Sequence, residues 1–370
     1  MTGKVSSKDK FFGCIAGVHV GSSMGAIVEG YNGWDYERIE KEFGTLNQLL
    51  PYEHYKNGWL REPGTTEDGV ERQKLMITAI MEKGDRVNAE DVRRIWVRDI
   101  HPNVAGVISE PFEAELLTMA KSKISAKDIG RYCDYAGLNS FARSCHPIGL
   151  INAGDVESAK EDILEVGQLY QTTNSRGLKW ACVTGVAIAE ATKPNATVDS
   201  VIGAIYDHCD KDEVVKEIDR ELNRTSHCKD FRELREYFDG VYSGEGVPYY
   251  MSYANEVVTK GICVFKMEKG DLYNSMISAV NLGRDTDCVA AVAAGIAGSL
   301  TGSKSMPRKF IEQVDDATTL IPNTNSRRTI KENADGLYDA FQNRLRKMQR
   351  YVEEMGEQST HNNTFLMEEK

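Results

Sequence analysis

Residues 11–28 form a stretch of 18 residues that contains no Lys, Arg, Asp or Glu. This length approaches that of a short membrane span. Glycines recur in the stretch at every fourth residue, namely Gly13, Gly17, Gly21 and Gly25. On a helix this spacing places them on one stripe, where another backbone can come close. Because serines and His19 dilute the apolar character and Glu29 follows directly, the sequence predicts a buried, closely packed helix rather than a signal peptide or membrane span.

The rest of the chain indicates an all-α fold. Alternation of apolar and polar residues over the length of a strand is scarce. Apolar residues instead recur at helical spacing in residues 73–81, 91–100, 114–121, 177–192, 200–209, 254–265 and 272–279. Thr197 is a candidate helix cap, with Asp199 in the first turn behind it.

No internal repeat and no Pro-rich or Gly/Ser-rich linker divides the chain. A single helical domain is therefore expected over residues 1–350. Residues 351–370 are polar and charged, and this tail is expected to be mobile, above all at residues 358–364.

Charge and cysteine content exclude several classes of protein. Lys and Arg number 45 against 56 Asp and Glu, which gives a net charge of -11 and argues against general nucleic-acid binding. The eight cysteines form no CxxC pair, so neither a zinc ribbon nor a thioredoxin-like site is indicated. Scattered single thiols suit a reducing compartment, and we expect a soluble cytoplasmic protein without membrane association. Composition gives no oligomeric state.

The first candidate for chemistry is the segment PGTTEDGVERQ at residues 63–73. A Pro-Gly turn is followed by Thr65 or Thr66 as a cap for a helix whose first turn holds Glu67 and Asp68. Acids in a first turn also interact favourably with the helix dipole, so a purely structural interpretation stays open. The functional interpretation is that the Thr66 hydroxyl and the two carboxylates meet at a hard divalent cation.

A second acidic pair, Asp285 and Asp287, lies in residues 281–301. It precedes a predicted helix made almost entirely of Ala, Val, Gly and Ile. Such a helix must be buried, and it draws Asp285 and Asp287 towards the interior. Two buried carboxylates repel each other unless a cation or hydrogen-bond donors neutralise them. Capping would account for Asp285 alone, so metal binding is favoured here. Glu29 is either the exposed end of a packing helix or a catalytic acid, and the residues alone leave both open.

Taken in order along the chain, these segments resemble the ADP-ribosylglycohydrolase family. The family's opening pattern GxxxGxxxGDxxGxxxE is similar to the glycine stripe that ends at Glu29. Its Thr-Asp-Asp motif is similar to residues 66–68, and its closing Gly-Gly-Asp-Thr-Asp-Thr to residues 283–288. A weaker match links its Arg and Pro-Ile-Gly segment to RSCHPIGL at residues 143–150. The resemblance covers residues 13–302 and implies an orthogonal all-α bundle with a binuclear magnesium-type site at its centre.

The resemblance also implies roles for individual residues. Glu29 is the implied catalytic acid or base. The implied metal ligands are Thr66, Glu67, Asp68, Asp285 and Asp287. The implied substrate-binding residues are Ser22, Gly69, Arg143, Gly283 and Arg284. Two Mg²⁺ ions are expected, with Mn²⁺ as the alternative metal.

The chain departs from the family's pattern at four positions, which are Ser22 for Asp, Gly69 for Thr, Arg284 for Gly and Cys288 for Thr. A thiol is a poor magnesium ligand, so Cys288 puts the ligand set of one of the two ions in doubt. Arg143, Arg284 and the pair Ser22 and Ser23 are the candidate donors for phosphate groups of a substrate.

The implied activity is hydrolysis of a ribosyl bond. Its oxocarbenium-like transition state needs a held ribose, a directed water and a stabilised leaving group. Hard cations and a nearby carboxylate supply these needs. The implied substrate is ADP-ribose attached to a protein or to a small-molecule acceptor. The departures keep two alternatives open, a smaller N-riboside or nucleoside-like substrate and a crystallin-like protein that binds without catalysis.

Overall fold

The computed structural model shows an all-α protein and describes residues 5–30, 35–53, 58–100, 111–321 and 324–365. Its α-helices are α1 (Ser7–Gly25), α2 (Tyr36–Phe43), α3 (Asp68–Lys83), α4 (Ala89–Asp99), α5 (Pro111–Ala120), α6 (His146–Ile151), α7 (Val156–Val166), α8 (Arg176–Ala191), α9 (Val198–His208), α10 (Lys216–Arg224), α11 (Phe231–Val241), α12 (Ala254–Met267), α13 (Leu272–Val280), α14 (Thr286–Thr301), α15 (Arg308–Leu320) and α16 (Ile330–Phe365). Short helical turns are η1 (Ala26–Val28), η3 (Ala126–Tyr132), η4 (Gly167–Leu169) and η5 (Lys211–Val215). The strands described are β1 (Tyr52–Glu53) and β2 (Leu60–Arg61), which pair antiparallel.

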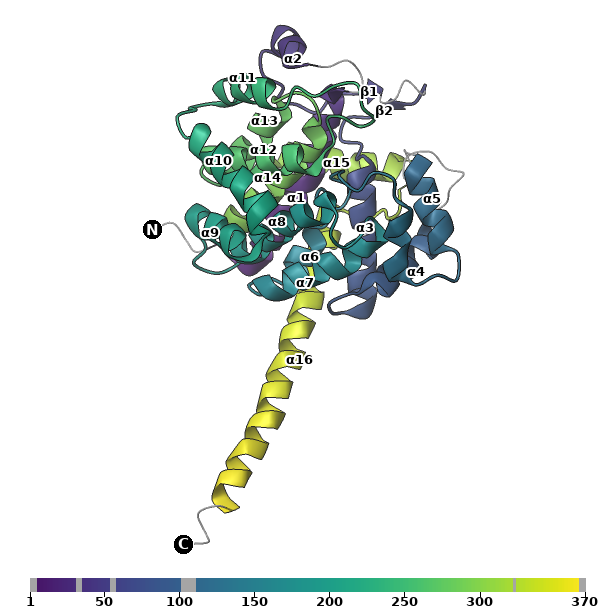
Figure 1. Cartoon of the computed structure of the whole chain (residues 1–370), viewed down its shortest axis with the longest axis vertical. Coiled ribbons are helices and arrows are strands. Elements are labelled where there is room, and N and C mark those ends of the chain that lie inside the picture. The colour runs from purple at the N-terminus through teal and green to yellow at the C-terminus, as the bar shows by residue number, and fades with distance from the viewer. Residues whose placement is uncertain (1–4, 31–34, 54–57, 101–110, 322–323, 366–370) are drawn as a thin grey trace.

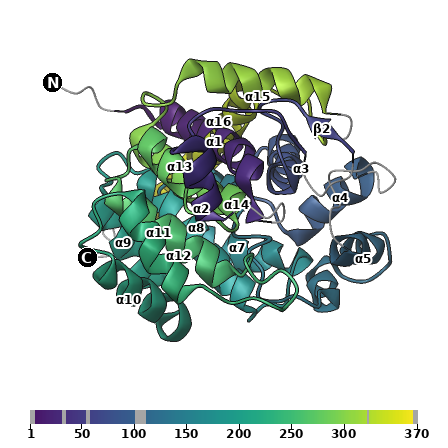
Figure 2. The same cartoon turned by 90° about the horizontal axis from the view of Figure 1, so that it is seen from above.

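Helices α1 and α14 pack against each other and form the centre of the fold (Figures 1 and 2). The glycine stripe of α1 makes this contact. A Cβ atom added at Gly17 would lie 2.5 Å from a carbonyl oxygen of α14, and one added at Gly25 would lie 2.4 Å from the Cα of Asp287. Gly13 meets Gly302 beyond the other end of α14, so the two helices run antiparallel. The end of α1 is therefore brought to the start of α14, and the predicted packing helix is confirmed.

Further helices surround this pair. Helices α8, α12 and α13 pack on α14, while α13 and the inner part of α16 pack on α1. The seven segments predicted to be helical coincide with α3, α4, α5, α8, α9, α12 and α13. Helix α9 begins as predicted, because the Thr197 side chain accepts a hydrogen bond from the backbone N–H of Ser200.

The start of α3 corrects one prediction. Its N-cap residue is Glu67, and neither Thr65 nor Thr66 caps the helix. Both hydroxyls are used elsewhere, since Thr65 Oγ1 donates to a backbone carbonyl and Thr66 Oγ1 donates to the Glu71 carboxylate. Competition from these tertiary and turn contacts moves the helix start past both threonines.

The apolar N-terminal segment is part of the core. Within the part of the chain that the structure describes, Ser7–Val28 is the one helical stretch long and apolar enough to cross a membrane, and 94% of its apolar window is buried inside the protein. All eight cysteines are free thiols.

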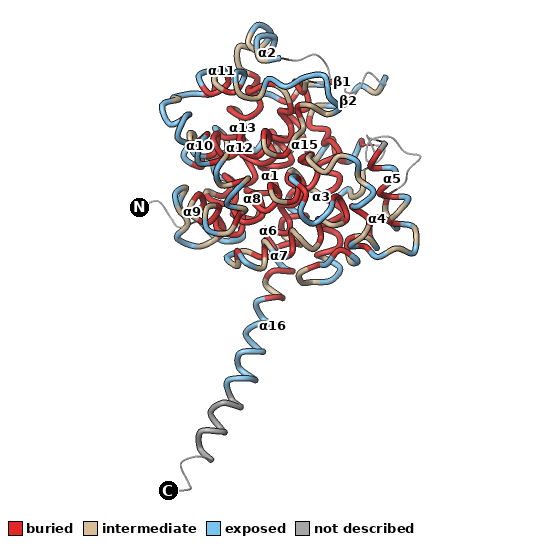
Figure 3. The backbone as a smooth tube through the Cα atoms, in the orientation of Figure 1, coloured by how far each residue is buried: buried red, intermediate tan, exposed pale blue. Residues whose placement is uncertain are grey.

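Helix α16 begins on the globule and projects away from it (Figure 1). One face of its inner part is buried, and its side chains are exposed from Leu345 to residue 356 (Figure 3). The helix continues past residue 351, so the expected boundary between domain and tail lies inside one helix. The mobility expected for residues 358–364 stays a prediction.

Candidate active site

Four acidic residues from three distant segments meet at one end of the central helix pair. Glu29 follows η1 directly, Asp68 opens α3, Asp285 is the N-cap residue of α14, and Asp287 lies in the first turn of α14. All four side chains are buried. Glu29, Asp68 and Asp285 line one small cavity with Arg143, and Asp287 lines an adjoining one that also touches Arg143. The structure therefore brings together the acids that the sequence singled out.

This cluster holds excess negative charge away from water. Burial, followed by repulsion from Asp287 and Asp285, raises the pKa of Glu29 well above its usual value. Burial and the charge of Asp285 likewise raise the pKa of Asp287, although the Arg143 guanidinium opposes this shift. Carboxyl groups that raise one another's pKa in a buried place mark a position where a cation binds favourably.

Asp285 and Asp287 offer the clearest position for a divalent cation. Donor atoms of Asp285, Asp287 and Cys288 lie within 4.8 Å of one another. Asp285 Oδ2 accepts a 3.0 Å hydrogen bond from Asn139 Nδ2, whereas its buried Oδ1 has no hydrogen-bond partner among the described residues. A buried carboxylate oxygen without a donor, next to a second carboxylate, fits a hard cation such as Mg²⁺ or Mn²⁺.

The carboxylates expected to bind a second ion are paired with arginine side chains. Both oxygens of Asp68 accept hydrogen bonds from the Arg143 guanidinium, with 2.7 Å between Nη1 and Oδ1. Glu67 forms an ion pair with Arg61, with 3.1 Å between Oε1 and Nε, and it also accepts a hydrogen bond from the Tyr52 hydroxyl. Each of these acids is therefore neutralised by a neighbouring side chain.

Thr66 and Cys288 are also poorly suited to a second ion. Thr66 Oγ1 donates to Glu71 Oε1 at 3.1 Å and accepts a 3.4 Å hydrogen bond from Lys74 Nζ. Burial and the neighbouring acids raise the pKa of the Cys288 thiol well above its usual value. A neutral thiol is a poor partner for magnesium.

The acids differ in how far other protein groups already bind them. Asp285 presents an open carboxylate oxygen beside Asp287, while Thr66, Glu67 and Asp68 all bind other protein groups. Their roles as metal ligands stay predictions. Arg143 supplies a positive charge beside Asp68.

The sequence matches the ADP-ribosylglycohydrolase family over residues 4–347. The chain belongs to the ADP-ribosylglycohydrolase family. A solved structure described as an "ADP-ribosylglycohydrolase-related protein complex" is similar, with a TM-score of 0.59 at 16% sequence identity, and the match covers 90% of this chain and 99% of that chain. At this identity the likeness shows the shared all-α fold alone. No curated protein matches the sequence.

Two positions that depart from the ADP-ribosylglycohydrolase pattern lie beside Arg143. Ser22 and Gly69 line the cavity that also contains Asp287. A Cβ atom added at Gly69 would lie 3.2 Å from the Arg143 side chain. The missing side chain at Gly69 therefore leaves room for the guanidinium to reach Asp68.

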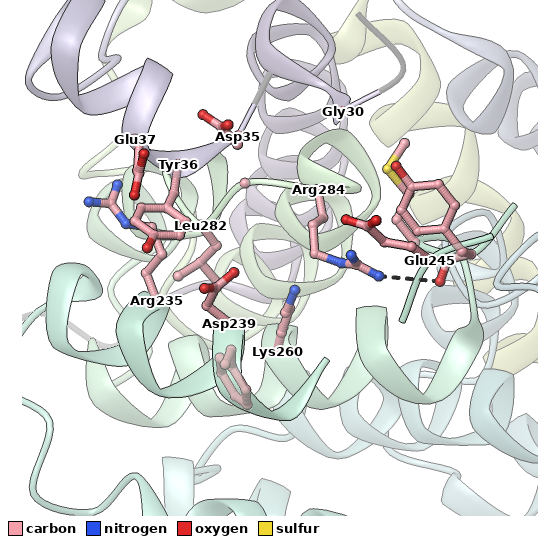
Figure 4. Close-up of a pocket in the computed structure, with 14 residues that line it drawn as sticks. Gly30, Asp35, Tyr36, Glu37, Arg235, Asp239, Glu245, Lys260, Leu282 and Arg284 are labelled. Carbon is pink, nitrogen blue, oxygen red and sulfur yellow. Dashed lines mark hydrogen bonds between the residues drawn. The ribbon is translucent and has the colours of Figure 1, made fainter. Parts of the chain in front are cut away.

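Gly283 and Arg284 line a separate cavity of about 420 Å³, in which Figure 4 shows Arg284. Arg284 has a φ angle of 66°, in the left-handed region that favours the glycine of the family pattern. Its guanidinium donates to both carboxylate oxygens of the buried Glu256, at 2.6 and 3.0 Å. Arg284 thus neutralises an acid outside the candidate ion position.

Three residues at the acid cluster, Asn139, Tyr52 and Arg61, were not predicted from the sequence. Asn139 orients Asp285, and its position four residues before Arg143 is the one signal that could have identified it. Tyr52 and Arg61 come from the short hairpin and hold the first carboxylate of the α3 motif. Strands of two residues are too short to show alternation, so the sequence carried no signal for them.

Proposed function

We propose that this chain is a divalent-metal-dependent hydrolase that cleaves a ribosyl bond, with an ADP-ribosyl group on a protein or small-molecule acceptor as its substrate. The observation that carries the proposal is the buried, unpaired Oδ1 of Asp285 beside Asp287 and Glu29. Burying several acids together is unfavourable unless a bound cation compensates them. Membership of a glycohydrolase family gives that cation a chemical use.

We assign ion binding, orientation of a ligand and proton transfer to different residues. Asp285 and Asp287 would hold the ion, and Asn139 fixes the orientation of the Asp285 carboxylate. A divalent ion bound there would lower the pKa of a water molecule and would chelate the vicinal hydroxyls of the ribose. Glu29 lines the same cavity as Asp285, which supports a role in exchanging a proton with the attacking water or the departing group.

The cavity shared by Glu29 and Asp285 also has an aromatic wall. Phe112 and Tyr249 line it, with ring centroids 5.7 Å apart in an edge-to-face arrangement. Tyr249 packs in turn against Tyr135, at 4.7 Å between centroids. Rigid rings next to the acids support binding of a flat group adjoining the ribose.

A smaller N-riboside is the second candidate substrate, and the state of two arginines favours it. Arg143 is bound to Asp68, and Arg284 is bound to Glu256. A diphosphate would have to share either guanidinium with its buried carboxylate, which leaves fewer N–H donors for the phosphates. An unphosphorylated riboside makes no such demand.

The two candidates are separated by their products. The purified chain is incubated with Mg²⁺ or Mn²⁺ and with ADP-ribosylated peptides, free ADP-ribosyl compounds and simple N-ribosides, and the products are identified by mass spectrometry. We expect metal-dependent hydrolysis of one class. Glu29→Gln should lower the rate by about 10²-fold or more, because it removes the proton-transferring group. Glu62→Gln alters an exposed glutamate and should leave the rate unchanged.

Two results would argue against the proposal. Wild-type turnover by Glu29→Gln would remove the acid or base role of Glu29. Absence of any product, together with no thermal shift on adding either metal, would favour a binding protein without catalysis.

A further inference from the structure

The acid cavity, which Glu29, Asp68 and Asp285 line together with Arg143, is too small for a ribosyl group. Its volume is about 30 Å³. A single water molecule needs about 10–15 Å³ of such volume, so the cavity has room for about two water molecules. A ribosyl substrate must therefore displace part of the wall before it reaches the acids.

The part of the wall best suited to move belongs to residues 243–253, which connect α11 to α12. Residues 243–248 of this segment are exposed. A Cβ atom added at Gly244 or Gly246 would meet no heavy atom within 4 Å. Because few contacts hold these residues, they can shift without disturbing the packed helices.

The far end of the segment is anchored next to the acids. Leu138 and Tyr253 form an isolated antiparallel bridge. The backbone N–H of Asn139 donates to the carbonyl of Ser252 at 2.9 Å, and the Asn139 side chain orients Asp285. Movement is therefore confined to the residues that precede this anchor.

Tyr249 carries the segment into the cavity wall. Its φ angle is 57°, in the left-handed region that residues with a side chain rarely adopt. Tyr249 lines the acid cavity, and its ring centroid lies 5.7 Å from that of Phe112 and 4.7 Å from that of Tyr135. Such a backbone conformation persists only where the surrounding contacts hold it in place.

Arg284 (Figure 4) holds the segment at two points. Its Nη2 atom lies 3.3 Å from the carbonyl oxygen of Gly244 and 3.3 Å from that of Tyr250. Glu256 of α12 fixes the same guanidinium through both carboxylate oxygens. Residues 244–250 are thus tied to α12 at both ends by one side chain. The glycine of the family pattern has no side chain that could make these contacts.

We propose that Arg284 is a positioning residue that holds residues 244–250 closed, with Tyr249 in the wall of the acid cavity, and that a ribosyl substrate enters when this segment releases. The proposal rests on the hydrolase activity proposed above. A substrate that binds only the released form has its apparent affinity reduced by the fraction of chains in that form. Arg284 therefore sets the apparent affinity without touching the substrate.

Amide hydrogen exchange of the full chain, followed by mass spectrometry, tests the hold of Arg284 without any substrate. Arg284→Gly restores the residue of the family pattern, and glycine accepts the φ angle of 66° at this position. We expect peptides covering residues 243–253 to exchange about tenfold faster than in the wild type, because the segment loses two hydrogen bonds. Peptides of α14 should keep the wild-type rate. Arg232→Ala removes an exposed arginine that contacts residues 44 and 45, and should leave the segment unchanged.

Lys260→Met separates this hold from the ion pair with Glu256. Lys260 Nζ also donates to Glu256 Oε1, at 2.6 Å, so the variant removes one partner of the carboxylate and leaves Arg284 in place. Its exchange in residues 243–253 should match the wild type. Equal acceleration in Lys260→Met and Arg284→Gly would assign the effect to Glu256 and overturn the proposal. Wild-type exchange in Arg284→Gly would overturn it as well.

Separate measurement of KM and kcat tests the entry of substrate. For a compound that the chain hydrolyses, Arg284→Gly should lower KM by about tenfold without raising kcat, because the released form is more populated and the acids are unchanged. Faster exchange with an unchanged KM would show that Tyr249 does not limit entry, and would overturn the gating role. A chain that hydrolyses none of the compounds contradicts the proposed function, whereas the exchange rates still decide whether Arg284 holds the segment.

Discussion

Arg143 donates hydrogen bonds to both carboxylate oxygens of Asp68, and its Nη1 lies 3.6 Å from Cys288 Sγ. Although burial opposes the shift, the charges of Asp68 and Asp287 raise the pKa of Arg143 well above its usual value. A fixed positive charge therefore sits among the acids without any ion. This residue decides how much of the negative charge is left for a cation to neutralise.

Replacing Arg143 should show how far its guanidinium neutralises the buried acids. Arg143→Ala leaves the Asp68 carboxylate buried and unpaired, and we expect a loss of about 3 kcal/mol in the free energy of unfolding, measured by urea denaturation without divalent ions. Mn²⁺ should raise the melting temperature of the variant more than that of the wild type, since Asp68 becomes available as a ligand. Arg131→Ala removes an exposed arginine as a control. Wild-type stability of Arg143→Ala would contradict the role of this ion pair.

Burial of His146 predicts that the free energy of unfolding depends on pH. Its Nε2 donates to the carbonyl of Ala291 at 2.9 Å, and its Nδ1 accepts from Gln73 Nε2 at 3.1 Å, so the neutral ring is satisfied on both sides. Burial lowers the pKa of His146 from 6.5 to about 4. Between these values the unfolded chain binds a proton that the folded chain does not. The free energy of unfolding therefore falls as the pH falls through this window, by about 3 kcal/mol in all.

His146→Gln should remove this contribution. Urea midpoints measured between pH 7 and pH 4 are expected to fall less steeply for His146→Gln than for the wild type. His227→Gln replaces an exposed histidine and should keep the wild-type slope. Parallel curves for the wild type and His146→Gln would show that His146 titrates alike in both states.

At the scale of elements, the contact between α1 and α14 fixes the site. The period of four glycines was visible in the sequence, and it predicts the close packing because the spacing alone defines the stripe. The start of α3 was not predictable in the same way. Which group the Thr66 hydroxyl bonds depends on the position of Glu71 after folding, and this contact displaced the expected cap.

The close packing at the glycine stripe predicts that a side chain added there lowers the free energy of unfolding. Gly17→Ala would place a Cβ atom 2.5 Å from a carbonyl oxygen of α14, and we expect a loss of about 1–3 kcal/mol, because the backbones must move apart. Gly203→Ala in α9 has no heavy atom within 4 Å of the new Cβ and should gain up to about 1 kcal/mol from helix propensity. Thermal and urea unfolding compare the two. Equal stability of both variants would contradict the backbone contact.

At the scale of the whole molecule, the order of the motifs predicted that distant acids would meet. The all-α fold followed from helical periodicity, and its family type from the resemblance, because both depend on residue patterns within segments. The number of ions could not be predicted, since it depends on which acids find a cationic side chain in space. Arg61 reaches Glu67 from a hairpin that the sequence did not reveal.

The most direct test of an ion site in the acid cluster is to measure Mn²⁺ binding to the purified chain by titration calorimetry. The wild type should bind one ion per chain, because Asp285 is the one carboxylate among the described residues with a buried, unpaired oxygen, and Asp287 lies beside it. Asp287→Asn should abolish this binding, and Asp316→Asn, which alters an exposed carboxylate, should preserve it. A wild-type chain that binds no divalent ion, or an Asp287→Asn variant that binds Mn²⁺ as tightly as the wild type, would contradict an ion site in this acid cluster.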